Sequence, residues 1–173
     1  MKGQKKTNLT TLCYLERDGK YLMMHRVKKE HDINRDKWVG VGGHFEPDET
    51  PEECLLREVC EETGLMLDRF ALRGIITFMS DKWQTEYMFL YTADRFHGDF
   101  IGRDACREGT LEWVDKDAVY DLPIWKATRS SSVSCASSAR YSHSSCAMWV
   151  IRWSKRHWMG ERSRLARKFA GTR

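Results

Sequence analysis

The chain of 173 residues lacks the patterns typical of zinc-thiolate, secreted and membrane-spanning proteins. Its six cysteines include no Cys-x-x-Cys pair and no zinc-like spacing. No apolar run approaches the ~18 residues that a membrane-spanning helix needs. The first residues, MKGQKKTNLTTL, contain lysines but no apolar stretch of the length found in signal peptides. These absences favour a reduced, cytoplasmic protein with no membrane partner.

A large net charge is also lacking, but the charges are unevenly distributed. The formal net charge is +4. Residues 127–173 contain ten Lys or Arg against one acidic residue, whereas residues 1–126 contain 19 against 24. The length suits one domain with a substantial core. We therefore expect one folded domain in residues 1–126 and a different, basic tail in residues 127–173.

Several segments of residues 1–126 have the pattern of β-strands. Residues 10–27, TTLCYLERDGKYLMMHRV, form two apolar runs around Asp18-Gly19, which predicts an antiparallel hairpin. Residues 36–45 form an extended run that breaks at Gly42-Gly43, where the backbone can approach a ligand without a Cβ in the way. Further strand-like segments are residues 72–80, 85–93 and 109–119. Strands around one strong helix predict an α+β fold.

The strong helix is predicted at residues 51–63. Thr50 suits the N-cap with Glu53 three positions later, Pro51 suits the first helical position, and Gly64 can end the helix in a left-handed conformation. At 100° per residue, one face should carry the apolar residues Leu55, Leu56, Val59, Cys60 and Thr63.

Three glutamates, Glu58, Glu61 and Glu62, lie on the other side of this helix. A solvated helix face is the ordinary interpretation of such a cluster. Two effects oppose it, because Glu58 and Glu62 repel each other at i, i+4 and the helix dipole disfavours anions in the last turn. A hard divalent cation such as Mg²⁺ prefers oxygen ligands and would remove both penalties. The pattern therefore indicates a metal site.

The segment GHFEPDETPEECLLREVCEETGL, Gly43 to Leu65, resembles the Nudix box. The residues at its defined positions are Gly43, Glu49, Arg57, Glu58, Val59, Glu61, Glu62, Gly64 and Leu65. The resemblance implies a Nudix hydrolase with an α/β/α sandwich fold and a mixed sheet. Such an enzyme cleaves a nucleoside diphosphate linked to another group, and it uses Mg²⁺ or Mn²⁺.

The resemblance also implies roles for individual residues. Glu58, Glu61 and Glu62 would bind the metal, the carbonyl of Gly43 would join them, and Arg57 would orient a glutamate. The general base stays open among Glu61, Glu62, Glu86 and Glu108. For Glu86, a functional role and a plain exposed polar position on a strand have equal weight.

Residues 10–125 are similar to one Nudix subgroup, the 8-oxo-dGTP diphosphatases, which sanitise the nucleotide pool. This similarity implies hydrolysis of an oxidised purine nucleoside triphosphate to the monophosphate and pyrophosphate. Trp125 stands where the subgroup carries a base-stacking tryptophan, and Trp38 could also stack, although a tryptophan at a strand edge is more often part of the core. Together with Glu86, these are the expected substrate-binding residues. The acidic residues that usually follow the tryptophan in the subgroup are missing from WKATRSSS.

Alternatives to this function come from two classes. The substrate could be another nucleoside diphosphate derivative, such as a dinucleotide or a sugar nucleotide. Nudix folds also serve as ligand-binding regulatory domains, but those commonly lose box glutamates, and here all are present. The oligomeric state is not predictable from these residues.

The tail has nine serines in its first 21 residues and no sustained hydrophobic period. It could be a basic nucleic-acid-binding arm or a disordered tail. A third hypothesis is a frameshift: serine codons TCN, read one nucleotide earlier, become NTC codons for apolar residues, and the shifted frame then reads like a folded protein. We favour the frameshift, which makes nucleic-acid binding an unlikely function and predicts weak or unselective hydrolysis by this chain.

Overall fold

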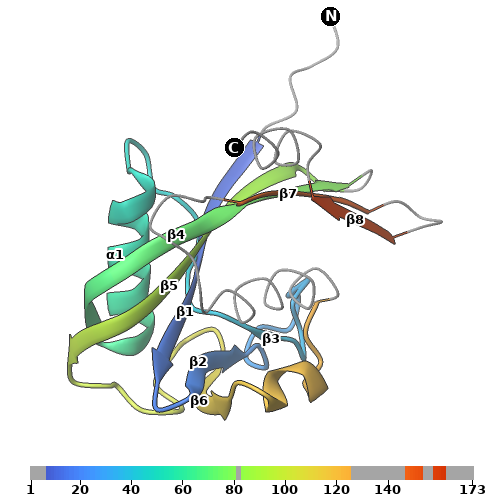
Figure 1. Cartoon of the computed structure of the whole chain (residues 1–173). Helices are drawn as coiled ribbons and strands as arrows, with labels where there is room; N and C mark the ends of the chain where they lie inside the picture. The colour runs from blue at the N-terminus through green and yellow to red at the C-terminus, as the bar shows by residue number, and fades with distance from the viewer. Residues whose placement is uncertain (1–6, 81–82, 126–146, 154–157, 163–173) are drawn as a thin grey trace, which may run out of the picture.

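The computed structural model describes residues 7–80, 83–125, 147–153 and 158–162. Within these residues it contains one α-helix, one 3₁₀ helix and eight strands in a single sheet (Figure 1). The strands are β1 (Thr7–Arg17), β2 (Lys20–His25), β3 (Trp38–Val39), β4 (Leu65–Ser80), β5 (Thr85–Gly98), β6 (Thr110–Asp115), β7 (Ala147–Trp153) and β8 (Trp158–Arg162). The helices are α1 (Pro51–Thr63) and the 3₁₀ helix η1 (Ala118–Asp121).

The predicted hairpin is confirmed as β1 and β2. Arg17 pairs with Lys20, so Asp18 and Gly19 form a two-residue turn. Both residues have positive φ, 50° and 75°, which is the conformation that such turns need. The strands predicted along residues 72–80 and 85–93 are confirmed within the longer strands β4 and β5. The strand predicted along residues 109–119 is confirmed only for β6, because its last two residues belong to η1.

The sheet is mixed, as expected. Its order is β3-β2-β1-β5-β4-β7-β8, with β6 paired to β2. The pairs β1–β5 and β4–β7 are parallel, whereas β1–β2, β2–β3, β2–β6, β4–β5 and β7–β8 are antiparallel. The central parallel pair β1–β5 aligns Thr7–Leu15 with Thr85–Ala93. This sheet and helix α1 agree with the predicted α+β architecture.

Helix α1 has the predicted ends. The Thr50 side chain accepts a hydrogen bond from the Glu53 backbone, and the Glu53 side chain accepts one from the Thr50 backbone, which completes a capping box. Gly64 follows in the left-handed conformation with φ 75°, and its N–H bonds to the carbonyl of Cys60. Local signals alone therefore set the limits of this helix.

The predicted apolar face of α1 is partly wrong. Leu56 is 40% exposed and Cys60 is exposed, whereas the buried residues are Cys54, Leu55, Val59, Glu62 and Thr63. The helix is rotated about its axis relative to the prediction. The physical reason is that α1 packs with Glu62 toward the backbone of the Gly42 loop, so a carboxylate occupies part of the buried face.

Two clusters of buried residues lie on the two faces of the sheet. Strand β2 alternates between them, because Leu22 and Met24 belong to one cluster and Tyr21 and Met23 to the other. The first cluster includes Leu55 and Val59 of α1, and the second includes residues of η1 and the segment after it. An α/β/α sandwich has two helical layers, and the described residues supply only the α1 layer.

The predicted tail is described only in part. Strands β7 and β8 fall within it, and the remaining residues of 127–173 lie outside the described ones. The hypotheses on the tail therefore stay predictions. In the described part of the chain, no helix is long and apolar enough to cross a membrane.

Candidate active site

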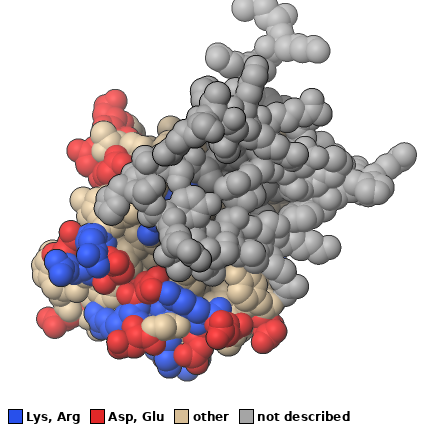
Figure 2. All heavy atoms as spheres, viewed as in Figure 1, with Lys and Arg blue, Asp and Glu red and all other residues tan. Residues whose placement is uncertain are grey.

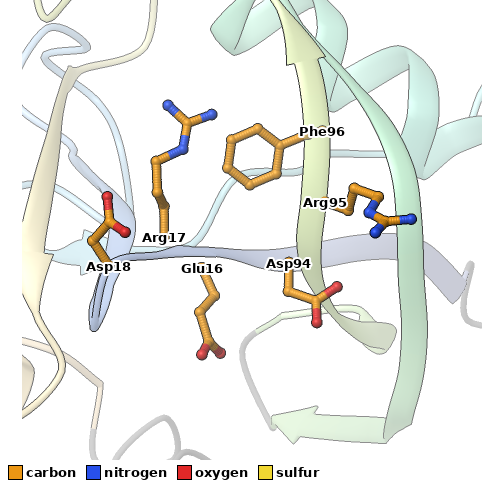
Figure 3. Close-up of a pocket in the computed structure, with 6 residues that line it drawn as sticks. All are labelled: Glu16, Arg17, Asp18, Asp94, Arg95 and Phe96. Atoms are coloured by element: carbon orange, nitrogen blue, oxygen red, sulfur yellow. The ribbon is translucent and has the colours of Figure 1, made fainter.

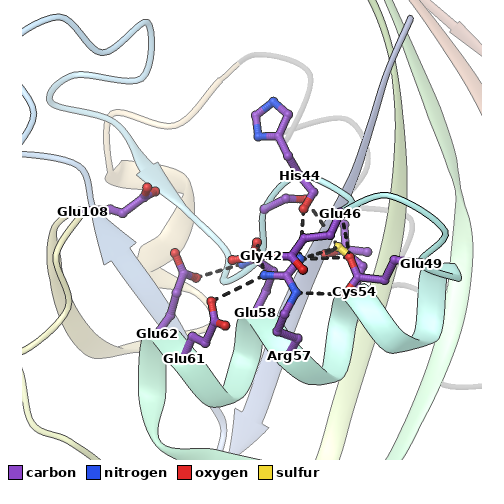
Figure 4. A network of polar contacts seen from close by, with 12 residues as sticks. Gly42, His44, Glu46, Glu49, Cys54, Arg57, Glu58, Glu61, Glu62 and Glu108 are labelled. Carbon is purple, nitrogen blue, oxygen red and sulfur yellow. Dashed lines mark hydrogen bonds and ion pairs between the residues drawn. The ribbon is translucent and has the colours of Figure 1, made fainter.

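Arg57 is the centre of a network of carboxylates on α1 and the loop before it (Figure 4). Its Nε and Nη2 donate to the two oxygens of Glu49, at 2.8 and 2.9 Å. Its Nη1 donates to Glu58 at 2.9 Å and, more weakly, to Glu61 at 3.4 Å. Nη2 also donates to the carbonyl of His44 at 3.0 Å. The hydrogen bond from Arg57 holds the pKa of Glu49 at about 2, so this pair stays charged.

Glu62 has a different environment from the other two box glutamates. Its side chain is buried, and the backbone N–H of Gly42 donates to its Oε2 at 3.0 Å. Burial raises the pKa of Glu62 to about 8, and the negative charges of Glu58 and Glu108 act in the same direction. Glu62 therefore joins the helix to the glycine loop at the place where negative charge concentrates.

Gly43 is required at this point because its backbone lies against a carboxylate. A Cβ built on Gly43 would collide with all three terminal atoms of Glu58. The carbonyl of Gly43 accepts a backbone hydrogen bond from Thr11 at 2.9 Å, which fixes the loop to β1. The predicted close approach at Gly43 is therefore made by Glu58 of the chain's own helix.

The ligand atoms that these residues offer are of the kind that a divalent cation binds. Glu58, Glu61, Glu62 and the carbonyl of Gly43 supply only oxygen atoms, which Mg²⁺ prefers, and the Glu58 carboxylate lies directly against the Gly43 backbone. In the described part of the chain, however, no three acidic, His or Cys side chains stand in a geometry that could hold a metal. The reason is visible in the contacts, since Arg57 holds Glu58 and Glu61 while the Gly42 amide holds Glu62.

Glu108 lies beside this helix in a second charged cluster. Arg26 and Lys29 both form ion pairs with its carboxylate, and Nε of Arg26 also bonds to Asp32 at 2.6 Å. Burial alone would raise the pKa of Glu108, but Lys29 and Arg26 outweigh it and lower the pKa. The negative charge of Glu108 contributes to the raised pKa of Glu62. Figure 4 shows Glu108 on the same side of the helix as Glu62. Glu108 therefore lies near the box, and its role in catalysis stays a prediction.

Glu86 is placed apart from this carboxylate cluster. It lies half-buried on β5 and accepts a hydrogen bond from the Thr10 hydroxyl at 2.7 Å. Thr10 is the bridge partner of His44, so Glu86 is near the loop of the box. Among the described residues, no hydrogen bond or ion pair joins Glu86 to Glu58, Glu61 or Glu62.

The two tryptophans expected to bind substrate lie in β3 and shortly after η1. The ring of Trp38 stacks on that of His25, with centroids 4.6 Å apart and planes at 6°, and it packs against the second core cluster. Trp125 is half-buried, and its Nε1 donates to Oδ1 of Asn34 at 2.7 Å. The Nζ of Lys37 lies 5.7 Å from the Trp125 ring centroid.

Sequence reasoning missed four residues of this region, namely Arg26, Lys29, Asp32 and Asn34. All four lie in the segment that joins β2 to β3 or at its start. They contact residues that are far away in the sequence, such as Glu108 and Trp125. The only available signal was the density of charges in RVKKEHDINRDK, residues 26–37, which a solvated loop would also show.

A hollow of about 380 Å³ lies at a different place, near the β1–β2 turn and the end of β5 (Figure 3). Its lining residues are Glu16, Arg17, Asp18, Asp94, Arg95 and Phe96. Arg17 lies over the ring of Phe96, 4.4 Å from its centroid. None of the lining residues belongs to the box, and the hollow lacks a cluster of carboxylates on one element. We therefore place the active site at α1 by its chemistry.

Comparisons with known proteins identify the family of this chain. The family model of the NUDIX domain matches residues 6–134. An uncharacterised Nudix hydrolase of Bacillus subtilis is 31% identical over 118 residues, which cover 66% of this chain and 70% of the relative. An oxidised purine nucleoside triphosphate hydrolase of Danio rerio is 30% identical over 121 residues, 69% of this chain and 73% of the relative. The crystal structure of a MutT mutator protein of Bacillus halodurans superposes with a TM-score of 0.69 at 22% identity, covering 89% of this chain and 97% of that one. The chain therefore belongs to the Nudix family and is a Nudix pyrophosphohydrolase.

Proposed function

We propose that the enzyme hydrolyses oxidised purine nucleoside triphosphates such as 8-oxo-dGTP, with Mg²⁺, to the monophosphate and pyrophosphate. Its role would be sanitation of the cytoplasmic nucleotide pool and hence protection of DNA. The observation that carries the proposal is that Glu58 and Glu62 contact the Gly42-Gly43 loop while Arg57 holds Glu61 beside them. The name of the Danio rerio relative supports this choice of substrate.

Nudix hydrolases generally use divalent cations. In this chain, Glu58, Glu61 and Glu62 would hold the ion together with the carbonyl of Gly43. The bound ion would supply neutralisation of the phosphate charge and a more acidic water molecule. Mn²⁺ has similar preferences for oxygen ligands and could replace Mg²⁺.

The remaining residues act by position and charge. Arg57 is fixed by Glu49 and in turn orients Glu58 and Glu61. Glu61, Glu62 and Glu108 are the proposed candidates for the general base. Glu108 is ionised at neutral pH, because Lys29 and Arg26 lower its pKa against the effect of burial, and an ionised carboxylate can accept a proton.

The base of the nucleotide would bind at the tryptophan side of the site. Trp125 offers an aromatic face, which stacks on a nucleobase with a contribution of about 1–3 kcal/mol per base. Trp38 is already stacked on His25 and half-buried, so we assign it a supporting role. Glu86, held by Thr10, is a further proposed contact.

A substrate panel tests the proposal. The full chain is assayed with Mg²⁺, with Mn²⁺ and with EDTA against 8-oxo-dGTP, dGTP, ADP-ribose and a dinucleoside polyphosphate. We expect Mg²⁺-dependent release of pyrophosphate that is fastest from 8-oxo-dGTP. Preferred turnover of ADP-ribose or of the dinucleotide would instead establish the alternative, a Nudix hydrolase of another nucleoside diphosphate derivative.

Two variants of helix α1 make the panel specific for the metal site. Glu61→Gln removes one ligand charge at a side chain that is 61% exposed, so the fold should tolerate it. Glu52→Gln makes the same chemical change in the first turn, and its amide oxygen can still accept the bond from Tyr91. We expect a loss of at least tenfold in kcat/KM for Glu61→Gln only. Equal turnover by wild type and Glu61→Gln would refute the proposed metal site.

A further inference from the structure

The segment between β2 and β3, which we call the β2–β3 loop (residues 26–37), is braced by its own backbone. Arg26 N–H donates to the carbonyl of Lys37 at 2.9 Å, and Asp36 N–H donates back to the carbonyl of Arg26 at 2.8 Å. Arg35 N–H bonds to the Asp32 carbonyl at 3.0 Å, and Lys37 N–H bonds to the Asn34 carbonyl at 2.9 Å. The loop therefore has a defined shape that can carry side chains into fixed positions.

One side chain in this loop, Asp32, lies in the middle of a longer chain of hydrogen bonds. Its Oδ2 accepts from Nε of Arg26 at 2.6 Å, and Arg26 pairs with Glu108. Its Oδ1 accepts from the backbone N–H of Asn34 at 2.9 Å. The Asp32 side chain is only 6% exposed, so these bonds compete little with water.

Asn34 continues the chain to the tryptophan. Its backbone is fixed by Asp32, and its side-chain oxygen accepts the indole N–H of Trp125 at 2.7 Å. The series Trp125–Asn34–Asp32–Arg26–Glu108 thus runs from the proposed base-stacking ring to the carboxylate beside Glu62. The two ends of the proposed site are connected through one loop.

We propose that Asn34 is a positioning residue that fixes the indole plane of Trp125 for stacking on the purine base. This inference rests on the proposed function of Trp125. An indole held only by packing can swing about its side-chain torsions, whereas an acceptor at Nε1 selects one orientation. Preorganisation of this kind improves binding because less rotational freedom is lost when the ligand arrives.

The geometry predicts a separation of effects. Removal of the Asn34 side chain frees the indole but leaves the Asp32–Arg26–Glu108 bonds in place, because Asp32 contacts the Asn34 backbone and not its side chain. Base binding should weaken while the chemical step stays unchanged. A hydrogen bond is worth about 1 kcal/mol net, which corresponds to about a fivefold change in affinity.

The experiment measures binding without turnover. Isothermal titration with 8-oxo-dGMP and dGMP is carried out on the full chain and on Asn34→Ala, Asn34→Asp, Trp125→Phe and Ile33→Ala. We expect about fivefold weaker 8-oxo-dGMP binding by Asn34→Ala. Asn34→Asp keeps an acceptor for the indole N–H, so it should bind 8-oxo-dGMP nearly as tightly as wild type. Ile33→Ala is the matched control, since Ile33 is the neighbouring residue and is 50% exposed.

A double-mutant cycle distinguishes positioning from a general loss of structure. Trp125→Phe cannot donate to Asn34, so adding Asn34→Ala to it should cause no further loss. With the triphosphate, Asn34→Ala should raise KM about fivefold and change kcat less than twofold. Additive effects, a fall in kcat alone or unchanged 8-oxo-dGMP binding by Asn34→Ala would overturn the inference.

Failure of this inference differs from failure of the proposed function. A wild-type chain that hydrolyses 8-oxo-dGTP, with binding indifferent to Asn34, overturns only the role of Asn34. A chain that hydrolyses none of the nucleotides, but binds the monophosphates in an Asn34-dependent way, supports the role of Asn34 and overturns the hydrolytic function. If Asn34→Ala does not fold, Trp125→Phe tests the same hydrogen bond from its donor side.

Discussion

Arg57 and Glu49 form a two-pronged ion pair, with Nε to Oε1 at 2.8 Å and Nη2 to Oε2 at 2.9 Å. Glu49 lies in the loop before α1 and Arg57 in the second turn of the helix, so the pair closes the loop onto the helix. The third nitrogen, Nη1, remains for Glu58 and Glu61. Orientation of two box glutamates therefore depends on a guanidinium whose other side is fixed.

Replacement of Arg57 by lysine should impair the enzyme although the charge is kept. A lysine has one ammonium group and cannot contact Glu49 in two places while reaching Glu58 and Glu61. We expect kcat/KM to fall at least tenfold in steady-state kinetics at saturating Mg²⁺. Arg69→Lys is the control, because Arg69 makes a similar two-pronged pair with Asp94 at the exposed sheet surface. Equal losses in both variants would contradict the special role of Arg57.

Two glycines should respond to alanine in opposite ways. In Gly43→Ala the new methyl group meets the mobile end of the Glu58 side chain, so the fold can adjust but the carboxylate is displaced. We expect a nearly unchanged Tm together with a large loss of metal-dependent hydrolysis. In Gly40→Ala the methyl group lies 2.6 Å from the backbone oxygen of Cys13, which cannot move away. This variant should lose thermal stability, and thermal melts with activity assays separate the two cases.

Removal of the helix cap should destabilise the protein without changing its chemistry. Thr50→Ala loses the side-chain acceptor of the capping box, at a cost of about 1 kcal/mol. For a chain of this size the Tm should fall by about 2–4 °C, measured by circular dichroism. Thr50→Ser keeps the hydroxyl and should melt within about 1 °C of wild type. A loss of the same size in Thr50→Ser would mean that the hydroxyl is not responsible.

Asp32 should contribute to stability in a pH-dependent way. Burial raises its pKa, but bonds from the Asn34 backbone and Arg26, together with the charge of Lys29, outweigh burial and lower the pKa below the ordinary value of about 4. A depressed pKa stabilises the folded state fully above the ordinary value, and this contribution is lost as the pH falls toward the folded pKa. Between pH 5 and pH 3, Asp32→Asn should therefore lose less unfolding free energy than wild type, as measured by urea titration. Parallel curves for the two proteins would contradict this assignment.

The frameshift hypothesis makes a prediction at the level of the gene. If residues 127–173 come from a shifted frame, their serine codons should be mostly TCN, and the frame one nucleotide earlier should stay open with apolar codons. Sequencing across codon 127 tests this. One uninterrupted frame with mostly AGY serine codons would remove the hypothesis. An expressed, frame-corrected chain should hydrolyse 8-oxo-dGTP faster than the present one.

Features with local causes could be predicted from the sequence. The limits of α1 follow from Thr50, Pro51 and Gly64, and the hairpin follows from Asp18-Gly19. The network around Arg57 also lies within one short segment. By contrast, the burial of Glu62 could not be predicted, because it depends on where the Gly42 loop lies against the helix. The rotation of the helix face, with Leu56 and Cys60 exposed, has the same cause.

The contacts of the β2–β3 loop could not be predicted for a different reason. Arg26 and Glu108 are 82 residues apart, and Asn34 and Trp125 are 91 residues apart. Nothing in a charged, polar loop indicates which distant side chain it will meet. The tertiary arrangement of the sheet decides it, since β2 pairs with β6 and carries the loop toward the segment before β6.

The parallel pairing of β1 with β5 has a consequence for folding order. Thr10 and Glu86, which are joined across this pair, are separated by 76 residues. Closure of so long a loop costs entropy before any contact compensates for it, so such pairings form late. Hairpin β1–β2 and helix α1 are local and can form early. Glu108, whose negative charge raises the pKa of Glu62, follows β5 in the chain, so this charged cluster is complete only when the two halves of the chain have joined. A ribosome-bound chain that ends before residue 85 would carry the helix without a working site.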